Sequence, residues 1–130
     1  WRREILRTIG GFDRRFGGTA HLEESDVSLR VRAQGYRIRF VPQASLTHLS
    51  LQVGGCRELD LARWLYWYGH NYLLFARKNL PAAAFPIFLA ERVAKLLYTG
   101  LRHARPAYFL RGMVGLFDGW RSSRRPEEGL

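Results

Sequence analysis

The chain has 130 residues, of which 47% are hydrophobic and 14% aromatic, and its formal net charge is +10 at pH 7. The apolar content is sufficient for a packed core, which excludes an intrinsically disordered protein. The single cysteine, Cys56, excludes an intramolecular disulfide and favours a reducing compartment. No apolar run approaches the ~20 residues of a membrane-spanning helix, and Pro86 interrupts the longest one.

The charge is unevenly distributed. Residues 1–60 carry ten Arg against seven Asp or Glu, whereas residues 61–130 carry eleven Lys or Arg against four acids. A basic, aromatic-rich second half can face nucleic acid or an anionic membrane surface. The equally weighted alternative is that the arginines only solvate helix faces.

The first elements in chain order surround an acidic cluster at 23–26, which reads Glu-Glu-Ser-Asp. A short helix is expected over 26–34, capped by Ser25 or Asp26 and ended by Gly35. Residues 36–41 alternate apolar and cationic side chains, which predicts a half-buried strand, and a second extended segment is expected over 44–48. This order would return His48 to the edge where the acidic cluster lies.

The second half has a helical pattern. Residues 49–58, which include two adjacent glycines, predict a loop and a boundary between a region at 1–55 and a helical region at 56–130. Apolar residues then recur at spacings of three and four, which predicts three amphipathic helices separated near Pro81 and Pro106. The charged helices motivate association with anionic lipid.

The acidic cluster suggests acid-base chemistry. A carboxylate at a helix N-terminus stays ionised, while a second carboxylate beside it can have a raised pKa and accept a proton near neutral pH. An imidazole near carboxylates can also help to bind Mg2+ or Mn2+, so His48 is a candidate metal ligand. The structural alternatives are an acidic helix cap and a histidine without a ligand.

A set of motifs resembles the C-terminal part of the catalytic domain of family 2 glycosyltransferases. The motifs are IGGFD at 9–13, EESDVSLR at 23–30, AQGYRI at 33–38, VPQA at 41–44 and His48, and the aromatic stretch WYGHNYLLFARK at 67–78 is similar to the helix that follows this domain. The resemblance implies an α/β fold, namely the C-terminal portion of a Rossmann-like GT-A domain followed by amphipathic helices. It also implies that the chain is a fragment, because the Asp-x-Asp motif of the family does not appear.

The resemblance implies a role for individual residues. Glu24 takes the position of the base that deprotonates the acceptor hydroxyl, with Glu23 before it and Asp26 as its rival. Asp13 would lie near the acceptor and donor sugar, or alternatively bond its own backbone in a turn. Three further roles follow: Gly11 allows a tight turn, Arg30 pairs with a carboxylate or a phosphate, and His48 binds the divalent metal.

The resulting expectation is an inverting hexosyl or deoxyhexosyl transferase. It would move a sugar from a nucleotide diphosphate sugar to a hydroxyl of a cell-envelope saccharide or lipid-linked acceptor, and the fragment alone would be inactive. It would work in the cytoplasm, peripheral to the inner face of the plasma membrane, with no nucleic acid as partner. The alternative is a basic helical module that binds nucleic acid or anionic lipid without catalysis.

Overall fold

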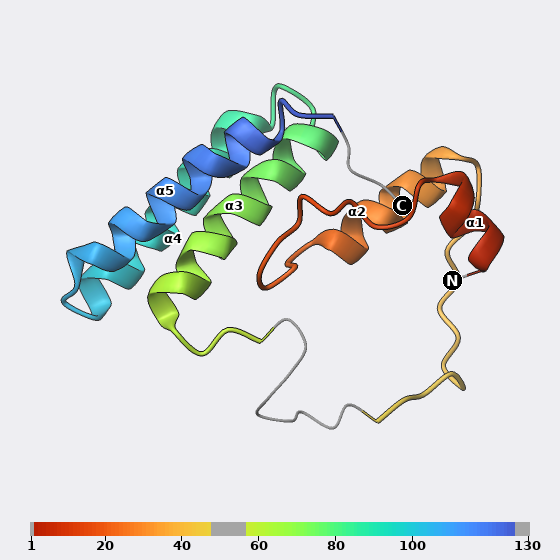
Figure 1. The fold of residues 1–130 in the computed structure, drawn as a ribbon, viewed down its shortest axis with the longest axis horizontal. Helices are drawn as coiled ribbons and strands as arrows, with labels where there is room; N and C mark the ends of the chain where they lie inside the picture. Colours follow the sequence, from red (N-terminus) through yellow and green to blue (C-terminus); the bar gives the residue numbers. More distant parts are fainter. Residues whose placement is uncertain (1, 48–56, 127–130) are drawn as a thin grey trace.

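The computed structural model describes residues 2–47 and 57–126, and within these ranges all regular structure is helical. The elements are α1 (Arg3–Thr8), α2 (Glu23–Ala33), α3 (Leu61–Asn79), α4 (Phe85–Arg102) and α5 (Pro106–Ser122). Figure 1 shows α3, α4 and α5 packed side by side, with α2 and the turn before it beside α3 and α1 farther from the bundle.

The three long helices confirm the three amphipathic helices predicted from the sequence. Asp60 caps α3 by accepting a hydrogen bond from the Ala62 amide at 2.9 Å, and Pro106 occupies the first turn of α5. Their apolar stripes meet in one core whose fully or nearly buried members are Leu65, Tyr68, Leu73, Leu96 and Leu116. No helix in the described ranges is both long and apolar enough to cross a bilayer.

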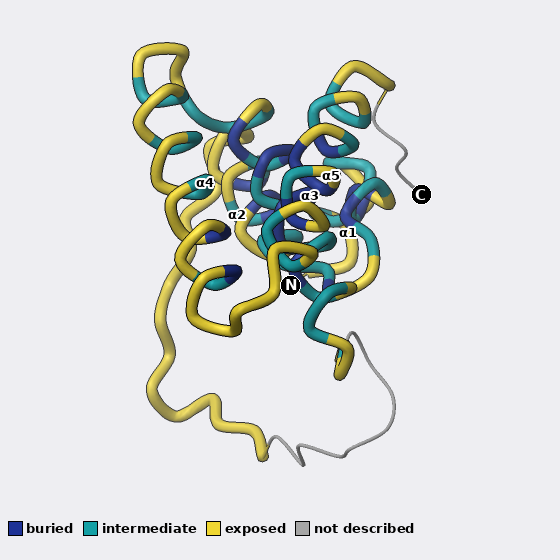
Figure 2. The backbone as a smooth tube through the Cα atoms, turned by 90° about the vertical axis from the view of Figure 1, so that its left-hand side faces the viewer, coloured by how far each residue is buried: buried dark blue, intermediate teal, exposed yellow. Residues whose placement is uncertain are grey.

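Helices α3 and α5 make the most extensive contact in the molecule. The contact is close because glycines of α5 face the backbone of α3: a methyl group on Gly115 would clash with the backbone of Tyr66, and one on Gly119 with that of His70. Helix backbones approach this closely only where side chains are absent. This contact makes α3 the central helix, and Figure 2 shows it largely covered while α4 is largely exposed.

The N-terminal part is anchored to α3 by both apolar and polar contacts. Val27 and Val31 of α2 are buried, as is Phe16 in the preceding turn, and the α2–α3 contact places them beside the bundle. Helix α2 ends at Ala33 and is followed, as predicted, by the left-handed Gly35, whose φ is +82° and whose amide donates to the Arg32 carbonyl. Its start differs from the prediction: α2 begins at Glu23, and neither Ser25 nor Asp26 caps it.

The predicted strand at 36–41 is wrong. These residues belong to no strand and are exposed, and residues 44–47 of the second extended segment are also irregular. A strand requires a neighbour to accept and donate its backbone hydrogen bonds, and the described part of the chain offers none. The alternation of apolar and cationic residues at 36–41 therefore reflects only a local preference for extended backbone, and no strand among the described residues pairs with this segment.

The α/β fold class is corrected for the same reason. The sequence resemblance implied a Rossmann-like GT-A portion, whereas the described residues form five helices and contain no strand. The helical structure thus contradicts the assignment to a family 2 glycosyltransferase domain. The predicted boundary at 49–58 lies almost wholly outside the described residues.

Candidate functional site

The turn after α1 places Asp13 in the interior. Gly10 and Gly11 both adopt positive φ values, +76° and +73°, which turn the chain back towards α2 and α3. The Asp13 carboxylate then accepts a hydrogen bond from the Arg15 amide at 3.1 Å. The turn-aspartate geometry considered from the sequence is therefore present.

Asp13 also forms two buried ion pairs. Its Oδ2 atom lies 2.6 Å from Arg15 Nη2 and 2.5 Å from Lys78 Nζ, and its side chain is 1% exposed. Burial raises the pKa of Asp13, but the hydrogen bonds from Arg15 and Lys78 outweigh it and lower that pKa to about 2. Asp13 is thus a carboxylate held ionised by its partners.

Asp26 completes the same network from α2. Its Oδ2 atom accepts from Arg30 Nε at 2.8 Å and from Lys78 Nζ at 3.1 Å, while Oδ1 accepts from Asn79 Nδ2 at 3.0 Å. The Asp26 side chain is fully buried. Lys78 therefore bridges the two aspartates and links the turn and α2 to the C-terminal end of α3.

Arg30 joins this network to the backbone of the turn. Its Nη1 and Nη2 atoms donate to the carbonyls of Ile9 and Gly11, both at 2.7 Å. Gly11 thus contributes both the turn and an acceptor. The structure brings four of the sequence-predicted site residues together: Gly11, Asp13, Asp26 and Arg30.

We call Asp13 and Asp26, together with the side chains that bind them, the aspartate pair; these side chains are Arg15, Arg30, Lys78 and Asn79. The aspartate pair does not fit a metal ion. Each carboxylate oxygen of Asp13 and Asp26 already accepts from a cationic or amide nitrogen. Mg2+ and Mn2+ require free carboxylate lone pairs, and a bound lysine ammonium repels them. Among residues 2–47 and 57–126 no three or more His, Cys, Asp or Glu side chains are grouped so that they could hold a metal ion.

Glu23 and Glu24 lie apart from the aspartate pair. Glu24 is exposed and borders an open hollow of about 560 Å3, whose other lining residues are Ser25, Ser28, Leu29, Arg32, Ile38 and Phe75. Burial and the neighbouring Glu24 carboxylate raise the pKa of the half-buried Glu23. Positions 24 and 26 point to different sides because two helical steps turn about 200°.

His48, the predicted metal ligand, lies outside the described residues, so that prediction is untested. A different histidine is buried in the bundle. His70 Nδ1 lies 2.9 Å from Asn71 Oδ1, and its Nε2 lies 3.0 Å from Ser122 Oγ of α5. Burial lowers the pKa of His70, so the neutral ring serves as a polar link between α3 and α5.

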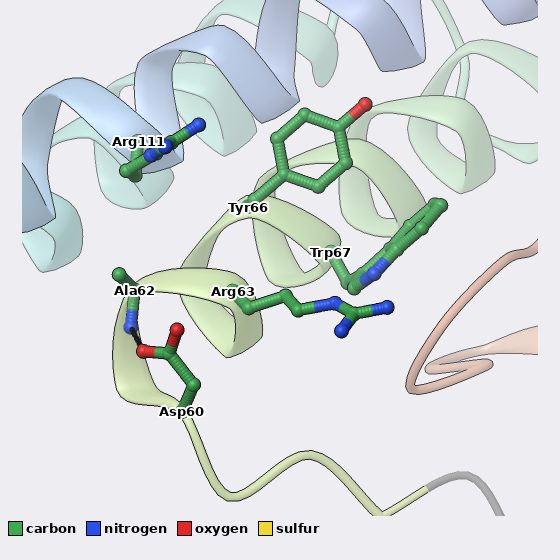
Figure 3. A pocket seen from close by; sticks show the side chains of 6 residues that line it. All are labelled: Asp60, Ala62, Arg63, Tyr66, Trp67 and Arg111. Carbon is green, nitrogen blue, oxygen red and sulfur yellow. Dashed lines mark hydrogen bonds between the residues drawn. The ribbon is translucent and has the colours of Figure 1, made fainter.

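A second hollow of about 340 Å3 is lined by the N-terminal part of α3 and by Arg111 of α5. Figure 3 shows Arg63 and Trp67 on its α3 side, with Arg111 reaching in from α5. Arg63 pairs with Glu58 at 3.0 Å, and the Tyr66 hydroxyl donates to Asp118 at 3.0 Å. None of the sequence-predicted site residues borders this hollow.

Sequence reasoning missed the residues that organise the aspartate pair: Arg15, Lys78 and Asn79. One signal was available, because Lys78 is one of only two lysines in a chain dominated by arginine. A lysine ammonium is a compact charge that can serve two carboxylates at once. Its distance from Asp13 and Asp26 along the sequence concealed the contact.

Comparison with known proteins identifies no relative: no family model matches the chain, nor does any curated protein or solved structure.

Proposed function

We propose that this protein takes part in sugar transfer from a nucleotide diphosphate sugar to a hydroxyl acceptor, with Glu24 as the general base. The observation that carries the proposal is the exposed Glu24 carboxylate at the edge of the 560 Å3 hollow, next to Glu23. The proposal rests on this carboxylate and its surroundings and assumes no family relationship.

The surroundings of Glu24 suit a saccharide hydroxyl. Ser25 and Ser28 add hydroxyl groups, Arg32 adds a cation, and Phe75 adds a ring on which a sugar can stack. Asp26 is less suited to the role, because its carboxylate is buried and already accepts from Arg30, Lys78 and Asn79. Glu24 is therefore the favoured base, with Glu23 as the nearest substitute.

The reaction needs one proton acceptor on the acceptor side. The acceptor oxygen forms a bond to the anomeric carbon while the bond from that carbon to the diphosphate oxygen breaks. The diphosphate leaves with the electron pair, and Glu24 receives the hydroxyl proton. Attack opposite the leaving group inverts the configuration at the anomeric carbon.

The positive charge of the second half supports a position at an anionic membrane surface, where a cell-envelope saccharide or a lipid-linked acceptor is available. The proposed location is the cytoplasmic face of the plasma membrane. Ligation of Mg2+ or Mn2+ by His48 stays part of the proposal.

The test is turnover of a full-length protein that contains this chain, since the chain alone is expected to be inactive, with nucleotide diphosphate sugars, saccharide or lipid-linked acceptors, and Mg2+ or Mn2+. Glu24→Gln should lower the rate roughly hundredfold to ten-thousandfold without changing the melting temperature. Glu4→Gln, which changes an exposed glutamate of α1, is the matched control. A Glu24→Gln rate equal to wild type would remove Glu24 from catalysis.

A second candidate function is lipid binding without catalysis. It is favoured by the exposed apolar side chains of α4 and α5, which lie among arginines. If the wild-type full-length protein releases no nucleoside diphosphate with any donor and acceptor but binds anionic vesicles, this candidate replaces the enzymatic one.

A further inference from the structure

Helices α4 and α5 each leave an apolar stripe exposed. On α4, Leu97 and Leu101 are 47% and 71% exposed. On α5, Leu110, Val114 and Phe117 recur at spacings of four and three and are 60%, 47% and 55% exposed. Exposed apolar residues at helical spacing form a patch and are not isolated surface residues.

The core contacts show which way these stripes face. On α4, Gly100 packs against Phe109 of α5, whereas Arg92 reaches α3 and donates to the Tyr68 hydroxyl at 2.6 Å. At about 100° per residue, Leu97 and Leu101 lie beyond the α5-facing side and away from α3.

The same reasoning orients α5. Gly115 and Gly119 face the backbone of α3, and Phe109 faces α4. Leu110 and Phe117 come next around the helix beyond the α4-facing side, again away from α3. Because α4 and α5 are antiparallel neighbours, the two stripes adjoin on one face of the helical hairpin. We call Leu97, Leu101, Leu110, Val114 and Phe117 the hairpin face.

Cations outnumber acids along the two helices that form the hairpin face. Residues 91–121 include six Lys or Arg against two acids, Glu91 and Asp118. Arg102 and Arg105 are exposed at the turn between the helices. Arg121 lies one turn beyond Phe117 at the other end, with its guanidinium 5.8 Å from the Phe117 ring centre.

From this arrangement we infer that the hairpin face binds the surface of an anionic lipid bilayer. The apolar side chains enter the boundary between headgroups and acyl chains, and the arginines contact lipid phosphates. Arg suits this role because its planar guanidinium binds phosphate through two hydrogen bonds. The helices lie along the surface, since none of those described is able to cross the bilayer.

Charge favours a bilayer over a second copy of the chain. Two hairpin faces in contact would bring two net positive charges together, because residues 91–121 of each copy carry six Lys or Arg against two acids. An anionic bilayer supplies the opposite charge. The inference rests on the proposed function in one respect, namely that the sugar acceptor lies at a membrane. It adds which surface of the protein binds that membrane.

The experiment is cosedimentation of the full chain with phosphatidylcholine vesicles that contain or lack phosphatidylglycerol. Wild type should bind only the anionic vesicles, and high salt should weaken binding because it screens the arginines. Leu110→Gln with Phe117→Gln should lower the affinity at least about tenfold, since each loses an apolar side chain that the lipid buries.

A matched pair of substitutions separates this face from general hydrophobicity. Leu46→Gln with Phe40→Gln changes the same residue types at positions that are each 85% exposed and distant in sequence from the hairpin. This pair should bind vesicles as wild type does. Equal losses in the two pairs, or absence of wild-type binding to anionic vesicles, would overturn the inference.

Two further measurements distinguish the remaining outcomes. Sedimentation equilibrium that shows a dimer abolished by Leu110→Gln with Phe117→Gln would replace the bilayer with a second copy. Glu24→Gln should bind vesicles as wild type does, so a failure of catalysis and a failure of membrane binding are observed separately.

Discussion

Lys78 shows how one side chain can organise residues that are far apart in the sequence. Its ammonium group contacts Asp13 at 2.5 Å and Asp26 at 3.1 Å, and all three side chains are nearly or fully buried. A buried carboxylate without a partner is costly, so each aspartate depends on the lysine. The aspartate pair therefore stabilises the attachment of the turn and α2 to α3.

The lowered pKa of Asp13 predicts acid sensitivity. Its folded-state pKa of about 2 is below the ordinary 3.8, so the stabilisation is complete above the ordinary value and is lost as the pH falls through about 2. The difference corresponds to about 2 kcal/mol of unfolding free energy. Urea unfolding between about pH 5 and pH 2 measures it.

Asp13→Asn is the control for this titration. The variant should be less stable at neutral pH, because Arg15 and Lys78 lose an ionised partner. Its unfolding free energy should fall less steeply than that of wild type over the acidic range. Parallel pH profiles for the two proteins would show that Asp13 is not the titrating group.

At the scale of elements, the contact between α3 and α5 depends on residues without side chains. Gly115 faces the Tyr66 backbone, so an added methyl group would have to separate two helices. Backbone atoms cannot move aside as a flexible side chain can. The contact also brings the Tyr66 hydroxyl to Asp118 and His70 to Ser122.

Gly115→Ala should lower the unfolding free energy by about 2 kcal/mol or more, even though alanine has the higher helix propensity. Thermal unfolding followed by circular dichroism measures the change. The neighbouring Val114→Ala is the control, because Val114 is 47% exposed and points away from α3. A Gly115→Ala protein as stable as wild type would contradict the close contact.

At the scale of the whole molecule, an exposed segment connects two packed parts. Residues 32–47 are exposed throughout, whereas the turn and helix before them are held against α3 by the aspartate pair and by Asn71, which donates to the Gly17 carbonyl at 2.9 Å. Cleavage of a peptide bond in the exposed segment should therefore leave the N-terminal part bound to the helical bundle.

Brief digestion with trypsin should cut at Arg37 and Arg39 before it cuts within α3, because proteases require an accessible, extended backbone. The two pieces should elute together from a sizing column. In Lys78→Met, where two buried carboxylates lose a partner at a cost of about 3–5 kcal/mol, they should separate. Separation of the wild-type pieces would disprove the proposed attachment.

Much of the helical structure follows from local sequence. Apolar spacing predicts α3, α4 and α5, and Pro81 and Pro106 predict where one helix gives way to the next, because both features act within a few residues. The end of α2 just before Gly35 follows from local geometry as well. The strand predicted at 36–41 is wrong, because local sequence does not show whether a neighbouring strand is available to pair with it.

The acidic cluster at 23–26 illustrates what local sequence predicts and what depends on tertiary packing. The sequence placed the acidic cluster at the N-terminal boundary of a helix, although it put the first helical residue at 26 and α2 begins at Glu23. The surroundings of these carboxylates depend on how α2 packs against α3. Asp26 faces Lys78 and is buried, whereas Glu24 borders an open hollow, because the helix turns and only one of its sides meets α3.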